Sequence, residues 1–101
     1  VALNDEDHVV RADAVERITD EDVLKKVALN DEHHRVRYLA VGRVTDQEVL
    51  KAAALNDQDH DVRWKAVEQI TDQAVLWELE WPSRDQGIRA VARRRLEELG
   101  G

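Results

Sequence analysis

The stretch VALNDEHHRVRYLAVGRVTDQEVLKA, residues 27–52, decides the fold because the same frame stands on both sides of it. Residues 1–26 read VALNDEDHVVRADAVERITDEDVLKK, and residues 53–78 read AALNDQDHDVRWKAVEQITDQAVLWE. The register continues without a gap into residues 79–101, where the frame is degenerate. A repeat of this length predicts one domain over residues 1–101, built by stacking copies of a small helical unit.

Each unit predicts two short helices, so the chain is expected to be all-α. The first helix should begin at a threonine, whose side-chain oxygen can accept an orphan backbone N–H; the threonines are Thr19, Thr45 and Thr71. Asp22 and Glu48 follow the first two at the spacing of a capping box. The helix is then expected to continue for roughly ten residues, to Leu29 in the first copy.

The second helix is expected over residues 32–43 of the middle unit, after a turn in which Asp31 caps it, as Asp5 and Asp57 do in their copies. A helical wheel gives this helix one apolar stripe, which is predicted to be buried: Val36, Ala40, Val41 and Val44, with Val10, Ala14, Val15 and Ile18, and Val62, Ala66, Val67 and Ile70. One pair cannot cover its own stripe, whereas stacked pairs can. The chain therefore predicts an alpha–alpha superhelix, a right-handed solenoid of about three and a half helix pairs.

The segments NDEDHVVRADAV, NDEHHRVRYLAV and NDQDHDVRWKAV resemble the HEAT repeat family, especially its short bacterial HEAT-like members. That family typically has an Asp in the inter-helix turn and a Val-Arg pair five and six residues later. The resemblance implies a ladder that joins the turns of neighbouring repeats: Asp5, Asp31 and Asp57 with Arg11, Arg37 and Arg63. Ser83 replaces the Asp in the last copy, so the ladder should end or change partner there. The unit is shorter than a typical HEAT repeat, and a leucine-rich-repeat variant, which alternates short helical pieces, is the nearest alternative; the Asp and Val-Arg frame favours the HEAT-like interpretation.

The composition excludes several classes of function. The 101 residues contain no Cys, which rules out disulfides, Cys-ligated zinc and thiol catalysis and suits a reducing cytosol. No apolar run approaches the length of a membrane span, and no signal peptide is recognisable, so a cytoplasmic protein that binds no membrane is expected. The formal net charge of −7 argues against a general affinity for nucleic acid.

No group of residues predicts catalysis, a cofactor or a metal. His8, His34 and His60 stand at one position of the unit, and equivalent positions of a solenoid lie about 10 Å apart, too far to share an ion. His33 is adjacent to His34, and neighbours on a helix do not face one way. The chain has no nucleophile elbow, phosphate loop or dinucleotide fingerprint, which predicts that it is not an enzyme.

The degenerate last unit is basic, with Arg84, Arg89, Arg93, Arg94 and Arg95. Arg93 replaces the stacking valine of the earlier copies, which predicts a terminal cap. Trp77, Leu79 and Trp81 are expected to seal the last interface beneath it. Nucleic-acid binding through these arginines is a remote alternative, because no basic stripe runs along the other repeats.

Positions 9, 12, 13 and 16 of each unit vary more than the frame around them. They follow i, i+3, i+4, i+7 spacing and are expected to point away from the buried stripe, on the face that the resemblance makes concave. Free drift usually yields Lys, Glu, Gln and Ala, whereas Tyr, Trp, Leu, Arg and Gly stand here; Trp64 could instead lean into the neighbouring repeat. The side chains predict a protein-binding scaffold whose contacts are Arg35, Tyr38, Leu39, Asp61, Trp64, Lys65 and Glu68.

The alternative function is a structural spacer or a fragment of a longer solenoid. The chain opens inside VALND, which reads as the tail of a first helix without its TDxxVL start. Leu3, Val10 and Val15 are then expected to lack cover, which predicts weak self-association at this end or a longer parent chain. Near-identical frames without Cys or Met suit either a recently duplicated array or a consensus-built one.

Overall fold

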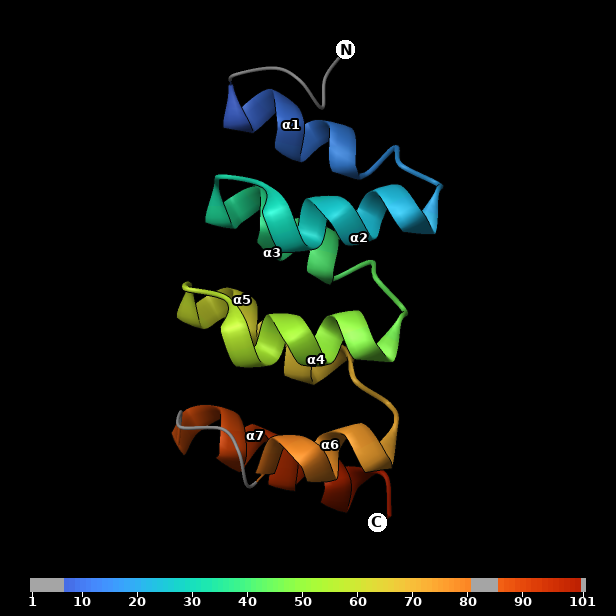
Figure 1. Cartoon of the computed structure of the whole chain (residues 1–101), viewed down its shortest axis with the longest axis vertical. Helices are drawn as coiled ribbons and strands as arrows, with labels where there is room; N and C mark the ends of the chain where they lie inside the picture. Colours follow the sequence, from blue (N-terminus) through green and yellow to red (C-terminus); the bar gives the residue numbers. More distant parts are fainter. Residues whose placement is uncertain (1–6, 81–85, 101) are drawn as a thin grey trace.

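The computed structural model describes residues 7–80 and 86–100, and these form seven helices and no strand (Figure 1). The helices are α1 (His8–Val15), α2 (Glu21–Asn30), α3 (His34–Val41), α4 (Gln47–Asn56), α5 (His60–Gln69), α6 (Gln73–Glu80) and α7 (Gln86–Glu98). The all-α prediction is thereby confirmed. None of these helices combines the length and the apolar content that crossing a membrane requires.

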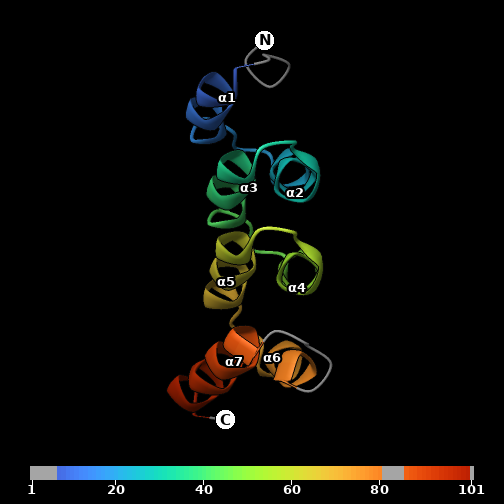
Figure 2. The ribbon, with the colours of Figure 1, turned by 90° about the vertical axis from the view of Figure 1, so that its left-hand side faces the viewer.

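The helices stack as pairs along one direction. Helix α2 packs on α3, α4 on α5 and α6 on α7, and each second helix also packs on the second helix of the next pair. Figure 2 shows the result as two columns, one of α1, α3, α5 and α7 and the other of α2, α4 and α6. The array is elongated, with extents of 43 × 23 × 16 Å. This stacking of helix pairs agrees with the predicted repeat architecture, while the handedness of a superhelix stays a prediction.

The predicted N-caps of the first helices are wrong by one residue. Asp20 and Asp46, not Thr19 and Thr45, cap α2 and α4, and the Asp20 carboxylate accepts the Asp22 N–H at 2.8 Å. Asp72, and not Thr71, accepts the N–H of Ala74 at 2.9 Å. The predicted capping boxes at Asp22 and Glu48 therefore do not form. The aspartate carboxylate accepts the N–H two residues ahead, and the N–H groups of Thr45 and Thr71 are bound by residues outside their own helices.

The predicted caps of the second helices are wrong by two residues. Asp7, His33 and Asp59 cap α1, α3 and α5. Asp31 instead stabilises the turn before α3, because its carboxylate accepts the His33 N–H at 2.9 Å, and Asp57 does the same for the Asp59 N–H at 2.8 Å. Asp5 lies outside the described residues. These Asx turns bring the chain round before the helix begins.

The apolar stripe is buried in the middle of the array and partly open at α1. Val36 and Val62 are fully buried, whereas their equivalent Val10 is 39% exposed. Val15 was expected to lack cover but is fully buried, because position 15 belongs to the core that α1 shares with α3. Leu3 lies outside the described residues. Among the residues expected to seal the last interface, Leu79 is fully buried, Trp77 is 54% exposed, which contradicts that expectation, and Trp81 is not described.

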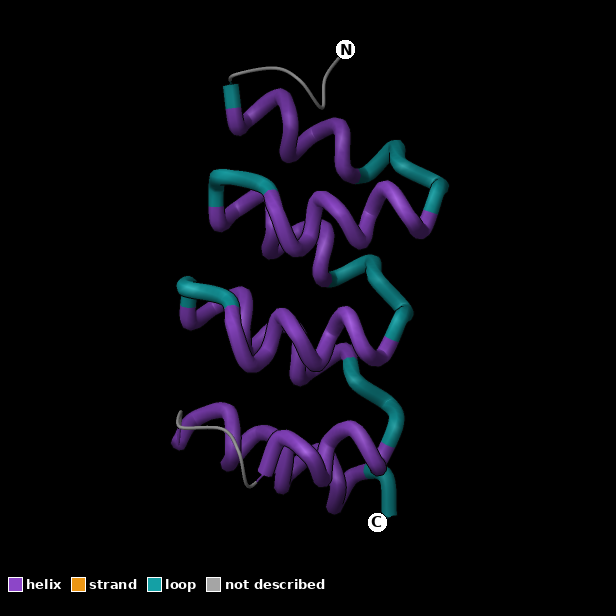
Figure 3. The backbone as a smooth tube through the Cα atoms, in the orientation of Figure 1, coloured by secondary structure: helices purple, strands orange, loops and turns teal. Residues whose placement is uncertain are grey.

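The loops lie along the two edges of the array, and the Asp turns share one of them (Figure 3). Along this edge the Arg11 guanidinium donates two hydrogen bonds to the Asp31 carboxylate, at 3.0 and 3.1 Å. One repeat further on, Arg37 makes the same fork to Asp57, at 2.9 and 3.1 Å. Such bidentate pairs fix both distance and orientation, so they hold neighbouring repeats in register.

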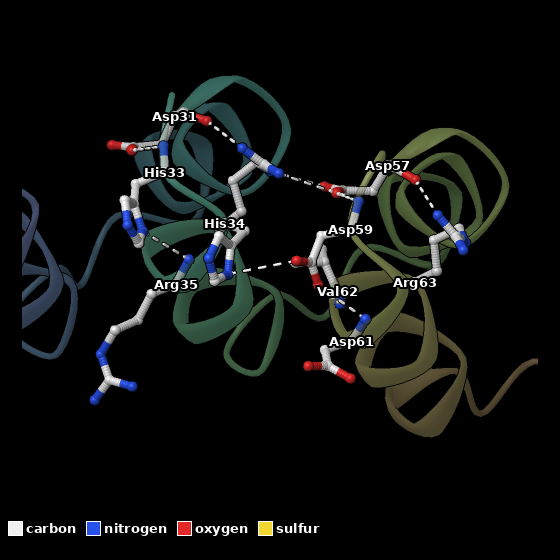
Figure 4. A network of polar contacts seen from close by, with 10 residues as sticks. Asp31, His33, His34, Arg35, Asp57, Asp59, Asp61, Val62 and Arg63 are labelled. Atoms are coloured by element: carbon white, nitrogen blue, oxygen red, sulfur yellow. Dashed lines mark hydrogen bonds and ion pairs between the residues drawn. The ribbon is translucent and has the colours of Figure 1, made fainter.

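The same arginines also bind their own turns. Arg37 Nη1 donates to the carbonyl of Asp31 at 2.8 Å, and Arg63 Nη1 donates to the carbonyl of Asp57 at 2.8 Å (Figure 4). Arg37 thus ties the turn of its own repeat to the turn of the next one. Ser83, where the ladder was expected to end or change partner, lies outside the described residues.

A second row of contacts, along the opposite edge, was not predicted. Glu21 Oε2 accepts the backbone N–H and hydroxyl of Thr45, at 3.0 and 3.2 Å, and Gln47 Oε1 accepts the N–H of Thr71 at 2.9 Å. Arg43 donates to the carbonyls of Val15 and Ile18, the latter at 2.8 Å. Each repeat therefore satisfies loop groups that its neighbour leaves open. The sequence signal was present, because each of the three regular units has Glu or Gln directly after Thr-Asp.

Replacing Arg37 with Ala should lower the free energy of unfolding by about 1–3 kcal/mol, because the Asp57 carboxylate and the Asp31 carbonyl would lose their partner while largely buried. The matched control is Arg35→Ala in the same helix, where the side chain is exposed and smaller effects are expected. Urea titrations of the two variants measure the difference, and equal midpoints would contradict the ladder's structural role.

Stability should fall in acid as Asp31 becomes protonated. Burial alone would raise the pKa of Asp31, but the hydrogen bonds from Arg11 and the His33 N–H, with nearby positive charge, outweigh it and hold the pKa below its ordinary 3.8. A lowered pKa stabilises the folded state above pH 3.8, and this contribution disappears as the pH falls through the folded value. The stability difference between the wild type and Asp31→Asn should therefore be constant above about pH 5 and shrink below pH 4. A pH-independent difference in urea titrations would refute this assignment.

Candidate functional site

A groove of about 870 Å³ lies between α3 and α5, on the column of second helices. Six of the seven side chains predicted to contact a partner line it, namely Arg35, Tyr38, Asp61, Trp64, Lys65 and Glu68. The groove also has four lining residues that were not predicted, His33, His34, Asp59 and Gln69. Three of these four stand at the start of their helices, one or two residues before the varied position 9, which was the available sequence signal.

Leu39 is the predicted contact that does not line the groove. Its side chain is partly buried and packs against the core. The expectation that positions 9, 12, 13 and 16 all point away from the buried stripe therefore fails at position 13, where Val91 is also buried. Ala12 at position 12 is buried too. The ladder and the stacking of second helices turn this side of the helix toward the neighbouring repeat, which the wheel of a single helix cannot show.

Two aromatic side chains form the apolar part of the groove. Tyr38 is 37% exposed and Trp64 is 40% exposed, and they occupy the same position in neighbouring repeats. The Lys65 ammonium lies 5.5 Å from the centre of the Tyr38 ring, within the range of a cation–π contact. Trp64 meets His60 of its own helix edge to face, with ring centres 5.3 Å apart. Both rings are supported from one side and open on the other, as a recognition platform requires.

The groove's acidic side chains differ in how far they are already engaged. Asp59 caps α5, accepting the N–H groups of Asp61 and Val62 at 2.8 and 3.2 Å, and its other oxygen lies 3.4 Å from His34 Nδ1. Glu68 is paired with Arg94 of α7. The Asp61 carboxylate is exposed and, within residues 7–80 and 86–100, makes no hydrogen bond or ion pair of its own. It is therefore available to a ligand.

The Arg35 guanidinium is the basic counterpart of Asp61. It is exposed, and among the described residues it has no hydrogen-bond or ion-pair partner. Figure 4 shows the side chains of Arg35 and Asp61 extending away from the polar network that holds the turns together. The groove thus presents one available cation and one available anion on neighbouring repeats, each one helical turn before the aromatic ring of its helix.

The histidines are closer than the sequence predicted. The rings of His8 and His33 stack with centres 3.8 Å apart, and those of His33 and His34 lie 4.6 Å apart. The predicted separation of about 10 Å applied to histidines at the same position of neighbouring repeats. The observed stack instead joins His8, at position 8 of one repeat, to His33, at position 7 of the next. His33 precedes the helix as its N-cap, so it does not follow the helical geometry that would turn it away from His34. No described group of three His, Cys, Asp or Glu side chains is arranged to hold a metal ion.

His33 supports the groove by remaining neutral. Burial lowers its pKa below the ordinary 6.5, and the charges of neighbouring His8, His34 and Arg11 lower it further. The neutral ring can accept the Arg35 N–H at Nδ1, where the distance is 3.1 Å. A histidine at this N-cap therefore fixes the start of the helix that carries Arg35 and Tyr38.

The described arginines of the basic C-terminal unit, Arg89, Arg93, Arg94 and Arg95, all have contacts. Arg94 pairs with Glu68, and Arg95 donates to the Ile70 carbonyl at 2.9 Å and to Glu98 at 3.0 Å. Arg93 is exposed at the position where earlier repeats bury a valine. Arg89, Arg93 and Arg94 line a smaller hollow of about 520 Å³ on α7 together with Glu97. Arg84 lies outside the described residues.

Gly42 should be replaceable by Ala with an increase in stability, of up to about 0.5–1 kcal/mol. Its backbone is right-handed helical, with φ −64°, so the conformation does not require glycine. The one close contact of an added Cβ would be the flexible end of Lys65, whose Cε would lie 3.0 Å away, while the Leu39 and Tyr38 carbonyl oxygens would be in ordinary contact at 3.5 and 3.7 Å. Displacing that end weakens the contact between Lys65 and Tyr38.

Thermal unfolding measures the stability of the Gly42→Ala variant. The contact between Lys65 and the Tyr38 ring is followed by the NMR chemical shifts of the Lys65 ε-methylene protons. We expect these protons to lose their ring-current shift while the melting temperature stays the same or rises. A clear loss of stability would show that Gly42 is needed for packing.

Comparisons with known proteins assign no family to the chain. No protein-family model matches it, and no curated protein or solved structure is significantly similar to it. The HEAT-like resemblance therefore stays a prediction based on the repeated Asp and Val-Arg frame. The function has to be inferred from the groove itself, whose described features are two half-exposed aromatic rings, one available cation and one available anion.

Proposed function

We propose that the protein is a non-catalytic interaction module, a cytoplasmic HEAT-like scaffold that binds a segment of a partner protein in the groove between α3 and α5. The observation that carries the proposal is the pairing of Tyr38 and Trp64, each more than a third exposed, in one groove beside available charges. Tyr, Trp and Arg are the residue types that contribute most to protein interfaces. A partner can bury these rings without removing any contact of the repeat frame.

The groove is built on rigid elements, which favours binding. Its walls are two helices whose starts are fixed by the N-caps His33 and Asp59. The forks from Arg11 and Arg37 hold the neighbouring turns. Because the groove backbone is held by these contacts, backbone conformational entropy is lost mainly by the partner on binding.

The lining suits a peptide segment better than a small apolar ligand. Apart from the two aromatic rings, its side chains are polar or charged. Pockets for small molecules are mostly apolar, with a few polar groups, whereas peptide recognition combines a few anchoring pockets with many polar contacts. We therefore place the binding energy at Tyr38 and Trp64 and the specificity at the charges around them.

The spacer or self-associating array is the second candidate. Val10 on α1 is 39% exposed, whereas its equivalents Val36 and Val62 in the later repeats are fully buried. A second copy stacked on this end would cover it. Nucleic-acid binding is less favoured, since Arg94 and Arg95 are already engaged and the net charge is −7.

Replacing both Tyr38 and Trp64 with Ala should abolish capture of the partner while the fold is retained, because both side chains are on the surface. Affinity capture with the tagged full chain, followed by mass spectrometry, identifies proteins bound by the wild type. Removing two interface aromatics should weaken binding of a genuine partner by at least about thirtyfold, roughly 2 kcal/mol.

The matched control is Trp77→Ala. Trp77 is 54% exposed on α6, among the first helices, and does not line the groove, so it removes an exposed aromatic ring without touching the site. A partner that binds the wild type and this control but not the double variant supports the groove. Partners captured equally by all three proteins, or only further copies of the chain, would favour the spacer instead.

A further inference from the structure

The available charges of the groove are related by the repeat itself. Arg35 and Asp61 both stand at position 9, in the units 27–52 and 53–78, and both lie in the first turn of a second helix. In the units on either side this position is occupied by Val9 and Gly87. Along the stacking direction the row therefore contains one positive and one negative charge, flanked by uncharged residues.

The spacing of this row matches an extended chain. Packed helices of neighbouring repeats lie about 8–10 Å apart. A segment in the polyproline II conformation has three residues per turn and rises about 3.1 Å per residue, so its residues i and i+3 point the same way and lie about 9 Å apart, close to one repeat of the array. Such a segment lying across α3 and α5 would bring residue i opposite one charge and residue i+3 opposite the other. Tyr38 and Trp64 stand one helical turn after Arg35 and Asp61, so a side chain between the two charges that points to that side would contact the rings.

We propose that the partner segment is extended in the polyproline II form and has an acidic and a basic residue three positions apart, with at least one large apolar residue between them. Its carboxylate pairs with Arg35, its cation pairs with Asp61, and the apolar residue packs on Tyr38 and Trp64. This inference rests on the proposed function and adds to it the chemistry of the ligand.

The other charged side chains of the groove already have contacts, which supports a ligand with a single pair of opposite charges. Asp59 is held by two backbone N–H groups and faces His34, Glu68 is paired with Arg94, and Lys65 lies over Tyr38. A partner that used these side chains would first have to break existing contacts. Arg35 and Asp61 require no such rearrangement, so they can select between partner segments without the free-energy cost of breaking existing contacts.

A helical partner would need different spacing. In a helix, seven residues advance about 10.5 Å, so its acid and base would be seven positions apart. Grooves that bind helices present a continuous apolar surface to anchors at i, i+3, i+4 and i+7. The groove here offers two separate rings among polar side chains, which favours the extended form.

Selection from a displayed library of random twelve-residue peptides tests the pattern. The full-length protein is the target, and the variant in which Tyr38 and Trp64 are both Ser removes peptides that bind elsewhere. Peptides that depend on the groove should be enriched in opposite charges at i and i+3, with an apolar residue between. Enrichment at i and i+7, or no enrichment of charge pairs, would overturn the inference while leaving a peptide-binding groove in place.

A charge reversal then identifies the pairing. For a selected peptide made synthetically, Arg35→Glu should weaken binding about fivefold or more, and replacing the peptide's acid with Lys should restore it. Arg17→Glu is the control, because it makes the same change of charge at an exposed position outside the groove.

The outcomes of the two experiments separate the two proposals. If Arg35→Glu and Arg17→Glu weaken binding equally, or if the Lys peptide fails to recover, the pairing is wrong although the groove can still bind. If no selected peptide depends on Tyr38 and Trp64, the proposed function itself fails, and the inference fails with it. Thermal melts of every variant verify that the proteins compared are folded.

Discussion

The fork from an arginine to the aspartate of the next repeat is the interaction on which the rest of the structure depends. A pair of short helices has too little apolar surface to stay folded alone, so each pair must be held in register with its neighbours. Arg37 does this at one edge of the array by binding the Asp57 carboxylate and the Asp31 carbonyl together. Two turns that belong to different repeats are thereby bound to one guanidinium group. This fixes the distance between neighbouring helix pairs.

The architecture could be predicted from the sequence because the repeated apolar positions show which side of each helix must be buried. A stripe such as Val36, Ala40 and Val41 recurs in each unit, and only stacking can bury it. Helix starts were less predictable, since Thr-Asp offers two candidate caps one residue apart. Asp46 rather than Thr45 caps α4, and the Thr45 N–H is bound instead by Glu21, a residue 24 positions earlier, which no local pattern contains.

The candidate site was predictable where variation between repeats marked exposed positions. Tyr38 and Trp64 were identified in this way and do line one groove. Leu39 was predicted to be exposed because a helical wheel of one helix treats the side opposite the apolar stripe as facing solvent. In the array this side is partly covered, and Leu39 packs against the core. The stack of His8 on His33 was missed for a related reason, since it joins two different positions of the unit across a repeat boundary. Prediction failed for the side chains whose surroundings are provided by the neighbouring repeat.

The row of contacts from Glu21 and Gln47 to the loops of the following repeats gives the array a direction. In both of these contacts the acceptor comes from the earlier repeat and the donor from the later one, so these units have two unlike ends. Unlike ends that fit one another allow a whole unit to be inserted or removed, because the new junction has the same donors and acceptors as the old. A gain or loss of a few residues instead shifts every later contact out of phase. The length of such a chain can therefore change readily in whole repeats and hardly at all in between, which makes unequal exchange between copies the natural way for it to lengthen or shorten.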